Sequence, residues 1–204
     1  MKANTLERVL SYILEIFSLT NLKRSGWRAF GIPEEERESV AEHIFEVSYL
    51  ALILASMEEL PETQWDSIVF MALIHDNPEA RIGDIDKIAA SYLRTKNAFH
   101  RAFYDQVANL PYALKNKLLK SAKMLEKESK EAILVKDADL LDFALRGLLF
   151  AQRGYKLREK VESLMSKLKT ASAKALLQQA LMEESLATLS VSYTHLTLPT
   201  ICSV

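Results

Sequence analysis

A short segment of the chain places one imidazole and three carboxylates directly after an apolar run. The segment reads ALIHDNPEARIGDI, from 72 to 85, and carries His75, Asp76, Glu79 and Asp84. A helix end followed by a solvated turn has the same appearance, and a His-Asp pair alone is a weak motif. The alternative is a metal site, and other parts of the chain are needed to decide between the two.

Two further residues favour the metal site. His43 shares a predicted helix face with Val40 and Val47, and Asp139 lies in the otherwise apolar stretch LVKDADLLDFAL. Burying imidazoles and carboxylates near one core is costly unless they pair or share a cation. Mixed His and Asp ligands suit Mn, Fe, Co, Ni or Zn better than Ca or Mg. We therefore expect one divalent transition metal ion.

Each residue also has a structural interpretation. A lone inward histidine is more often a satisfied core residue than a ligand, and His100 in NAFHRAF, which has no acidic partner pattern, is interpreted as structural. Asp137, Asp139 and Asp142 could form a solvated helix face. Because Asp137 and Asp139 are two residues apart on a helix, they point about 200° apart, and only one of them can face an ion.

The elements that must position these residues are all predicted to be helical. Ser39, with Glu42 three residues later, forms a capping-box pattern that predicts a helix start just before His43. We find no strand alternation and no repeat, so we expect an all-α fold, a single compact helical domain over residues 1–190. The predicted helices cover 4–20, 39 to the residues before Pro61, a stretch from Thr63 or Asp66 to His75, a short segment from Pro78 to Gly83, 97–109, 112–125, 129–151, 156–169 and 171–187, with a long loop at 21–38.

The last fourteen residues, VSYTHLTLPTICSV at 191–204, do not fit this pattern. They have β-type composition without a partner strand, and they resemble the translation of a sequencing-library adapter. We predict that 191–204 is a non-native tail whose deletion leaves melting temperature and activity nearly unchanged. The alternative is a natural disordered or strand-like tail.

Composition excludes several classes of protein. The chain has 204 residues, 49% of them hydrophobic and 26% charged, with a net charge of −1 and one cysteine. This is typical of a globular protein, gives no support for nucleic-acid binding through bulk charge, and excludes an intrachain disulfide framework. The N-terminus does not resemble a signal peptide, and the longest strongly apolar run, 49–55, is too short to span a bilayer. We expect a cytoplasmic protein without a membrane partner.

The order of these pieces resembles the HD-domain metal-dependent phosphohydrolases, and is most similar to their 5′-deoxynucleotidase branch. The resemblance covers roughly 26–151 and rests on GW at 26–27, ESVAEH at 38–43, HDNPE at 75–79, GD at 83–84 and KDAD at 136–139. It implies metal ligands at His43, His75, Asp76 and Asp139, acidic active-site residues at Glu79 and Asp84, and a sugar-packing residue at Trp27.

The loop before His43 departs from the family pattern. It carries two extra residues, and Gly26 stands where the family has a basic residue, so Arg24 or Arg28 is expected to take the phosphate-binding role. Glu79 could hold or deprotonate the attacking water, and Asp84 could orient that water or bind sugar hydroxyls. Arg81 and Lys136 are further candidate cations.

Three functions remain open from the sequence. The first is removal of the 5′-phosphate from (deoxy)nucleoside monophosphates, with a small-molecule nucleotide as substrate. The second is hydrolysis of another phosphate ester or signalling nucleotide, and the third is a non-catalytic metal-binding helical protein. A homodimer is compatible with the sequence.

Overall fold

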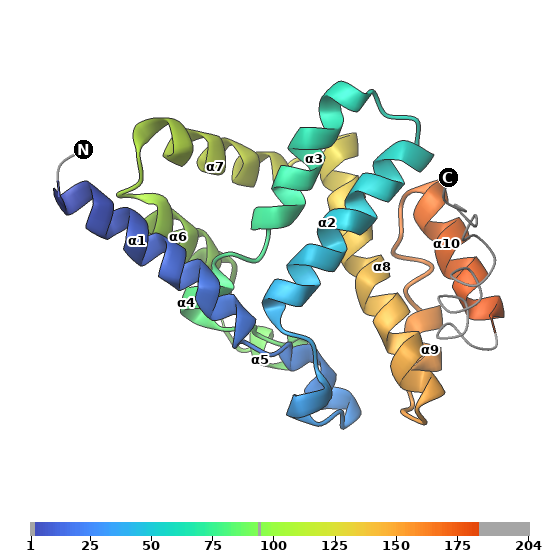
Figure 1. Ribbon diagram of the computed structural model, residues 1–204. Helices are drawn as coiled ribbons and strands as arrows, with labels where there is room; N and C mark the ends of the chain where they lie inside the picture. Colours follow the sequence, from blue (N-terminus) through green and yellow to red (C-terminus); the bar gives the residue numbers. More distant parts are fainter. Residues whose placement is uncertain (1–2, 94, 184–204) are drawn as a thin grey trace, which may run out of the picture.

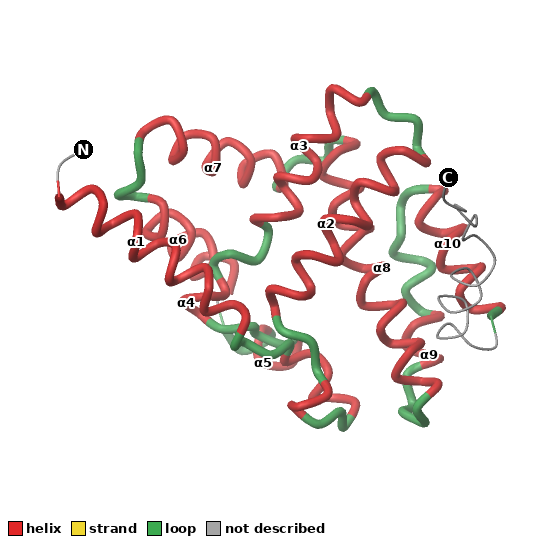
Figure 2. Tube along the Cα trace, viewed as in Figure 1, coloured by secondary structure: helices red, strands yellow, loops and turns green. Residues whose placement is uncertain are grey.

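The fold is built from helices throughout the part of the chain that the computed structural model describes, residues 3–93 and 95–183 (Figures 1 and 2). The only β-type contact in these residues is an isolated bridge between Lys23 and Ser39, so the all-α prediction is confirmed. The predicted tail at 191–204 lies outside them. The α-helices are α1 (Ala3–Phe17), α2 (Val40–Met57), α3 (Glu62–Ile74), α4 (Glu79–Ile82), α5 (Lys87–Ala90), α6 (Thr95–Val107), α7 (Tyr112–Leu125), α8 (Lys130–Gln152), α9 (Arg158–Glu162) and α10 (Ala171–Met182), and the 3₁₀ helices are η1 (Ser18–Thr20), η2 (Ser25–Phe30) and η3 (Glu34–Glu36).

Three long helices form the centre of the molecule. α2 packs against both α3 and α8, and their shared core includes the fully buried Val47, Leu54, Ile68, Met71 and Leu141. α9 and α10 pack on α8, whereas α7 packs on α3 and α6 on α7 (Figure 1). The α2–α3–α8 group is therefore the rigid frame that holds the residues of interest.

The start of α2 is fixed by a local interaction. The Ser39 hydroxyl accepts a hydrogen bond from the Glu42 backbone N–H, and the Glu42 carboxylate accepts one from the Ser39 backbone N–H at 2.6 Å. This is the predicted capping box. The helix therefore starts at a residue that places His43 on its buried face. This is the face predicted from the neighbouring Val40, and His43 is fully buried there.

α2 is also long and apolar enough to cross a membrane, judged by length and composition alone. Its packing against α3 and α8 is that of a core helix. Its outer face carries an exposed apolar stripe at positions four residues apart, namely Phe45, Tyr49, Ile53 and Met57. A homodimer stays a prediction.

The predicted loop at 21–38 is an ordered cover rather than an irregular connection. It contains η2 and η3, and backbone hydrogen bonds close its ends: Arg24 N–H donates to Glu38 O at 3.0 Å, and Val40 N–H to Leu22 O at 2.7 Å. Trp27 and Ile32 anchor its middle in an apolar cluster with Phe150. The cover is therefore tied to α2 at its base and to α8 along its length.

The prediction of one helix over 156–169 is wrong. Only Arg158–Glu162 is α-helical, and turns carry the chain from there to α10. The carboxylate of Asp137, in the middle of α8, accepts hydrogen bonds from the backbone N–H of Thr170 at 2.7 Å and of Lys169. These bonds hold the start of α10, so the preceding segment must end its helix early.

α8 and α9 approach each other closely at a glycine. A Cβ atom added to Gly147 of α8 would lie 2.9 Å from Cγ2 of Val161 in α9, and 3.8 Å from the ring of Trp27. Real Cβ atoms do not make contacts this short, so the missing side chain permits the observed spacing.

A candidate metal centre

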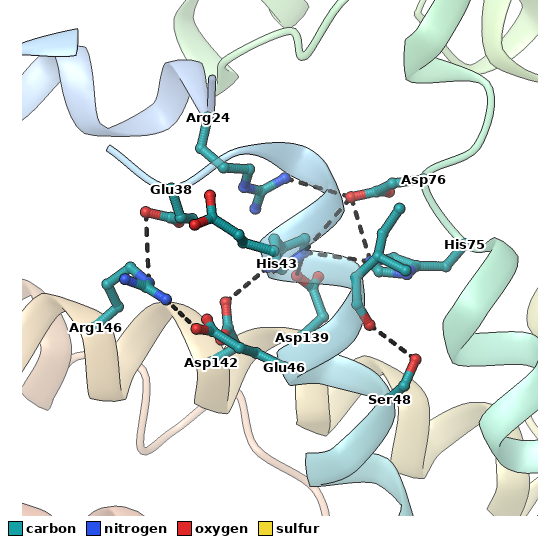
Figure 3. Close-up of polar contacts among 12 residues, drawn as sticks. Arg24, Glu38, His43, Glu46, Ser48, His75, Asp76, Asp139, Asp142 and Arg146 are labelled. Carbon is teal, nitrogen blue, oxygen red and sulfur yellow. Dashed lines mark hydrogen bonds and ion pairs between the residues drawn. The ribbon is translucent and has the colours of Figure 1, made fainter. Parts of the chain in front are cut away.

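Three of the four predicted metal ligands, His43, His75 and Asp76, have ligand atoms within 4.8 Å of one another, and Asp139 lies beside His43 (Figure 3). His43 lies on α2, His75 and Asp76 follow α3, and Asp139 lies on α8. Nε2 of His43 is 3.3 Å from Nε2 of His75, 3.3 Å from Oδ1 of Asp139 and 3.5 Å from Oδ2 of Asp76. Ligand atoms about 2.1 Å from a tetrahedral ion stand about 3.4 Å apart. The donor set and its spacing therefore fit a divalent transition metal ion.

Both imidazoles are oriented through their other nitrogen. Nδ1 of His43 lies 2.6 Å from Oδ2 of Asp142, and Nδ1 of His75 lies 2.6 Å from the backbone oxygen of Ala72. A carboxylate and a carbonyl only accept hydrogen bonds, so we assign a proton to each Nδ1. Each Nε2 then faces the cluster, which is the common second-sphere arrangement of metal-binding histidines.

Charges and hydrogen bonds between the histidines and the carboxylates shift the pKa values of both kinds of group. Burial lowers the pKa of His43, but hydrogen bonds with Asp139 and Asp142 outweigh burial and raise that pKa to about 10. Burial raises the pKa of Asp76, but the charges of His75 and Arg24 outweigh it and hold that pKa well below its usual range. A metal ion must therefore displace a proton from His43 as it binds.

The two aspartates of KDAD point in different directions. Asp139 faces the histidines with its side chain 43% exposed, whereas Asp137 is buried and holds the start of α10. Asp142 is also buried, against His43. The interpretation of these three residues as a solvated helix face is therefore wrong for Asp137 and Asp142.

Two of the proposed ligands, Asp76 and Asp139, line a cavity of about 390 Å³, and the two histidines lie behind them. Such a volume suits a small molecule, and the lining combines charged and apolar side chains. The polar residues of that lining include Arg24, Asp76, Glu79, Asp84 and Asp139, and the apolar ones are Ala29, Phe30, Ile85, Ile88, Leu140, Phe143 and Leu164 together with Trp27.

Glu79 is the unusual carboxyl of this cavity. It lies at the start of α4, and its buried Oε2 has no hydrogen-bond partner within the described chain. Burial, together with the charges of Asp76 and Asp84, raises the pKa of Glu79 to about 10, although Arg24 opposes the shift. In the metal-free chain Glu79 therefore carries a proton at neutral pH.

Arg24 and Asp84 connect the cover to the cluster. Arg24 Nη1 is 3.3 Å from Oδ2 of Asp76, and its Nε is 3.8 Å from Oδ2 of Asp84. The same Asp84 oxygen accepts a hydrogen bond from the backbone N–H of Ser25 at 2.6 Å. Asp84 thus has a positioning role that the sequence did not indicate, because it holds η2 against the cavity.

Arg28 does not join this group. Its side chain is 67% exposed and pairs with Asp86 at 2.5 Å, and it is not among the residues that line the cavity. Asp86 also caps α5 by accepting from the backbone N–H groups of Ile88 and Ala89. The structure therefore favours Arg24 over Arg28 as the cation nearest the cluster.

Trp27 is more deeply buried than a sugar-packing residue would be expected to be. It borders the cavity but is only 1% exposed, and its ring stacks on Phe143 with centroids 4.3 Å apart. Its indole N–H donates to Glu38 at 2.7 Å, and Arg146 pairs with both Glu38 and Glu46 (Figure 3). Only an edge of the indole can meet a ligand.

The remaining candidates lie away from the cluster. Arg81 pairs with Glu15 of α1, and Lys136 is exposed. His100 lies 3.4 Å from Glu126, the residue that follows α7, and its interpretation as structural stays a prediction. Neither Arg81 nor Lys136 lines the cavity.

Known proteins resemble the chain over most of its length. A family model described as HD domain matches residues 16–181. The 5′-deoxynucleotidase HDDC2 of Dictyostelium discoideum is 28% identical over an alignment of 169 residues that covers 75% of this chain and 85% of that relative.

Solved structures share the fold at lower identity. An HD-domain phosphohydrolase from Listeria innocua is 19% identical, with a TM-score of 0.69 over 93% of this chain and 99% of that one. A predicted metal-dependent phosphohydrolase from Magnetospirillum magnetotacticum is 21% identical, with a TM-score of 0.67 over 95% and 96% of the two chains.

Proposed function

Because the chain belongs to the HD-domain family, we propose that it removes the 5′-phosphate from (deoxy)nucleoside monophosphates. It is a metal-dependent phosphohydrolase, and the proposal concerns its substrate. The 5′-deoxynucleotidase of Dictyostelium discoideum supports a nucleotide, since the two chains align over 169 residues.

The observation that carries the proposal is that Asp76 and Asp139 of the donor cluster line a cavity that also has apolar walls. His43, His75, Asp76 and Asp139 would hold the ion, and two neutral imidazoles with two carboxylates balance its charge. When bound, a divalent ion polarises a phosphoryl oxygen and makes water a better nucleophile at neutral pH. The apolar wall would pack against the nucleoside part of the substrate.

Glu79 is the proposed proton-transfer residue. It can hold or deprotonate the attacking water, because a divalent ion beside it would oppose the raised pKa that burial, Asp76 and Asp84 cause. A protonated Glu79 can donate to the leaving oxygen of the nucleoside, and positive charge nearby lowers its pKa toward neutral, where proton exchange is most efficient.

Arg24 and Asp84 are proposed to position the substrate. Arg24 is buried against Asp76, so its guanidinium can reach a phosphate oxygen beside the ligands. Asp84 fixes the η2 cover and can accept a hydrogen bond from a sugar hydroxyl. Trp27 offers an indole edge to the sugar.

A non-catalytic metal protein fits the geometry less well. Structural sites have closed coordination, whereas this cluster opens into a cavity that also contains an unpartnered buried carboxyl. Hydrolysis of another phosphate ester uses the same cluster, so a substrate panel must decide.

The test is phosphate release by the purified protein from matched substrates. The panel contains deoxynucleoside 5′- and 3′-monophosphates, a phosphodiester and a polyphosphorylated nucleotide. We expect activity to be lost with a chelator, regained with Co or Mn, and higher for 5′- than for 3′-monophosphates. Metal-replete protein that cleaves only the diester or the polyphosphate would contradict the proposal.

A further inference from the structure

Two lysines line the cavity from elements that lie outside the metal cluster. Lys87 is the first residue of α5, and Lys160 lies on α9; both helices lie toward the lower edge of Figure 1. Within the described residues, neither lysine forms an ion pair with a carboxylate.

The arginines near the cavity are already paired. Arg24 faces Asp76 and Asp84, Arg28 faces Asp86, and the more distant Arg81 faces Glu15. The cavity lining holds five acidic residues and three basic ones, and two of those three are the lysines. The two lysines are therefore the cationic groups of the lining that are not paired with a carboxylate in the described chain.

The lysines also lie close enough to affect one another. Burial lowers the pKa of Lys87, and the neighbouring charges of Lys167 and Lys160 lower it further, against a smaller opposing effect of Asp139. Like charges brought together at a cavity wall repel, and a bound anion relieves that repulsion.

We infer that Lys87 and Lys160 form a two-lysine phosphate-binding site on the cavity wall, which selects dianionic phosphomonoesters over singly charged diesters. This inference rests on the proposed function, because it concerns the substrate of the same cavity. The two ammonium groups match the two negative charges of a phosphomonoester, and lysine binds phosphate as a point charge without requiring planar geometry. Neither lysine is a proposed metal ligand.

The test measures binding of inorganic phosphate to the Mn-loaded full-length protein by calorimetry. The double variant Lys87→Met and Lys160→Met keeps the aliphatic stems but removes both charges. We expect it to bind phosphate about 10- to 100-fold more weakly, the usual loss for charge-assisted hydrogen bonds, with unchanged metal content. Lys87→Arg with Lys160→Arg should recover most of the affinity.

The matched control removes two charges elsewhere. Lys120 and Lys156 are exposed and do not line this cavity, so Lys120→Met with Lys156→Met should bind phosphate like the wild type. With a 5′-monophosphate as substrate, the Lys87 and Lys160 double variant should raise KM more than it lowers kcat, and diester cleavage should change little.

The outcomes separate this inference from the proposed function. Equal phosphate affinity in the wild type and the Lys87 and Lys160 double variant, or no phosphate binding by the wild type, overturns the two-lysine site. Loss of phosphate binding in the double variant supports the site even if the wild type cleaves no 5′-monophosphate, a result that would contradict only the proposed function.

Discussion

His43 and Asp142 face each other across the interface of α2 and α8, with Nδ1 of the imidazole 2.6 Å from Oδ2 of the carboxylate. The two residues are 99 positions apart and both are buried. The contact holds the imidazole ring so that Nε2 points at His75, Asp76 and Asp139. A hydrogen bond between two core helices thus decides which nitrogen of His43 is available to an ion.

The first prediction follows from this pair. Asp142→Ala should weaken metal binding by about 10- to 100-fold, because residues that orient metal-binding histidines typically contribute that much. Titration of the metal-free protein with Mn, followed by calorimetry, measures the change. Asp142→Asn should retain more affinity, since the amide oxygen can still accept from Nδ1. Wild-type affinity in the alanine variant would contradict the assigned role.

The second prediction compares the two aspartates of KDAD. Asp139→Asn should abolish metal retention, because Asp139 faces His43 at 3.3 Å. Asp137→Asn should retain the metal but lower the melting temperature, because Asp137 holds the backbone at the start of α10. Metal analysis and thermal unfolding of both variants test this, and the reverse order of metal contents would exclude Asp139 as a ligand.

The third prediction concerns Glu79. Glu79→Ala should keep the ion, because Glu79 is not a proposed ligand, and should lower turnover by roughly 10²- to 10⁴-fold, the usual contribution of a positioned proton-transfer group. Steady-state kinetics are compared with metal content in the same preparations. Metal loss in proportion to the loss of activity would show that Glu79 is a ligand.

The fourth prediction is a pH dependence of stability. Burial raises the pKa of Glu46, Arg146 lowers it and Asp142 raises it again, and the net result is about 7 instead of 4.5. The folded protein therefore holds this proton more tightly than the unfolded chain, and it loses stability as pH rises from about 4.5 through about 7. Glu46→Gln removes that loss.

Thermal unfolding of metal-loaded wild type and Glu46→Gln between about pH 5 and about pH 8 provides the measurement. The melting temperature of the variant relative to the wild type should increase with pH and level off above about 7. A difference that stays constant over this range would show that Glu46 does not titrate there.

Local interactions made much of the fold predictable from the sequence. The capping box at Ser39 involves residues three apart, so the sequence alone gives the start of α2 and the inward phase of His43. Gly83 adopts a positive φ of 76°, which explains why the segment that starts at Pro78 ends there. The opposite directions of Asp137 and Asp139 likewise follow from helix geometry.

Contacts between residues far apart in the sequence could not be predicted from local patterns. The role of Asp142 depends on how α2 packs against α8, and its spacing alone suits a solvated face equally well. Residues 156–169 have an apolar spacing typical of a helix, and Leu164 and Leu168 are buried. These two leucines nevertheless lie in turns, because Asp137 accepts hydrogen bonds from the backbone just before α10. No local sequence pattern predicts that Lys87 and Lys160 line the same cavity.

Gly147 shows how a position outside the cavity can control its width. The missing side chain allows Val161 of α9 to approach α8, and Lys160, which lines the cavity, immediately precedes Val161. A methyl group at position 147 would clash with Val161 and push α9 away from α8. Lys160 on α9 would then move relative to Asp139 on α8. Selectivity for substrate size can therefore diverge between relatives, or be evolved in the laboratory, through the residue volume at a helix crossing while every residue that touches the substrate stays the same.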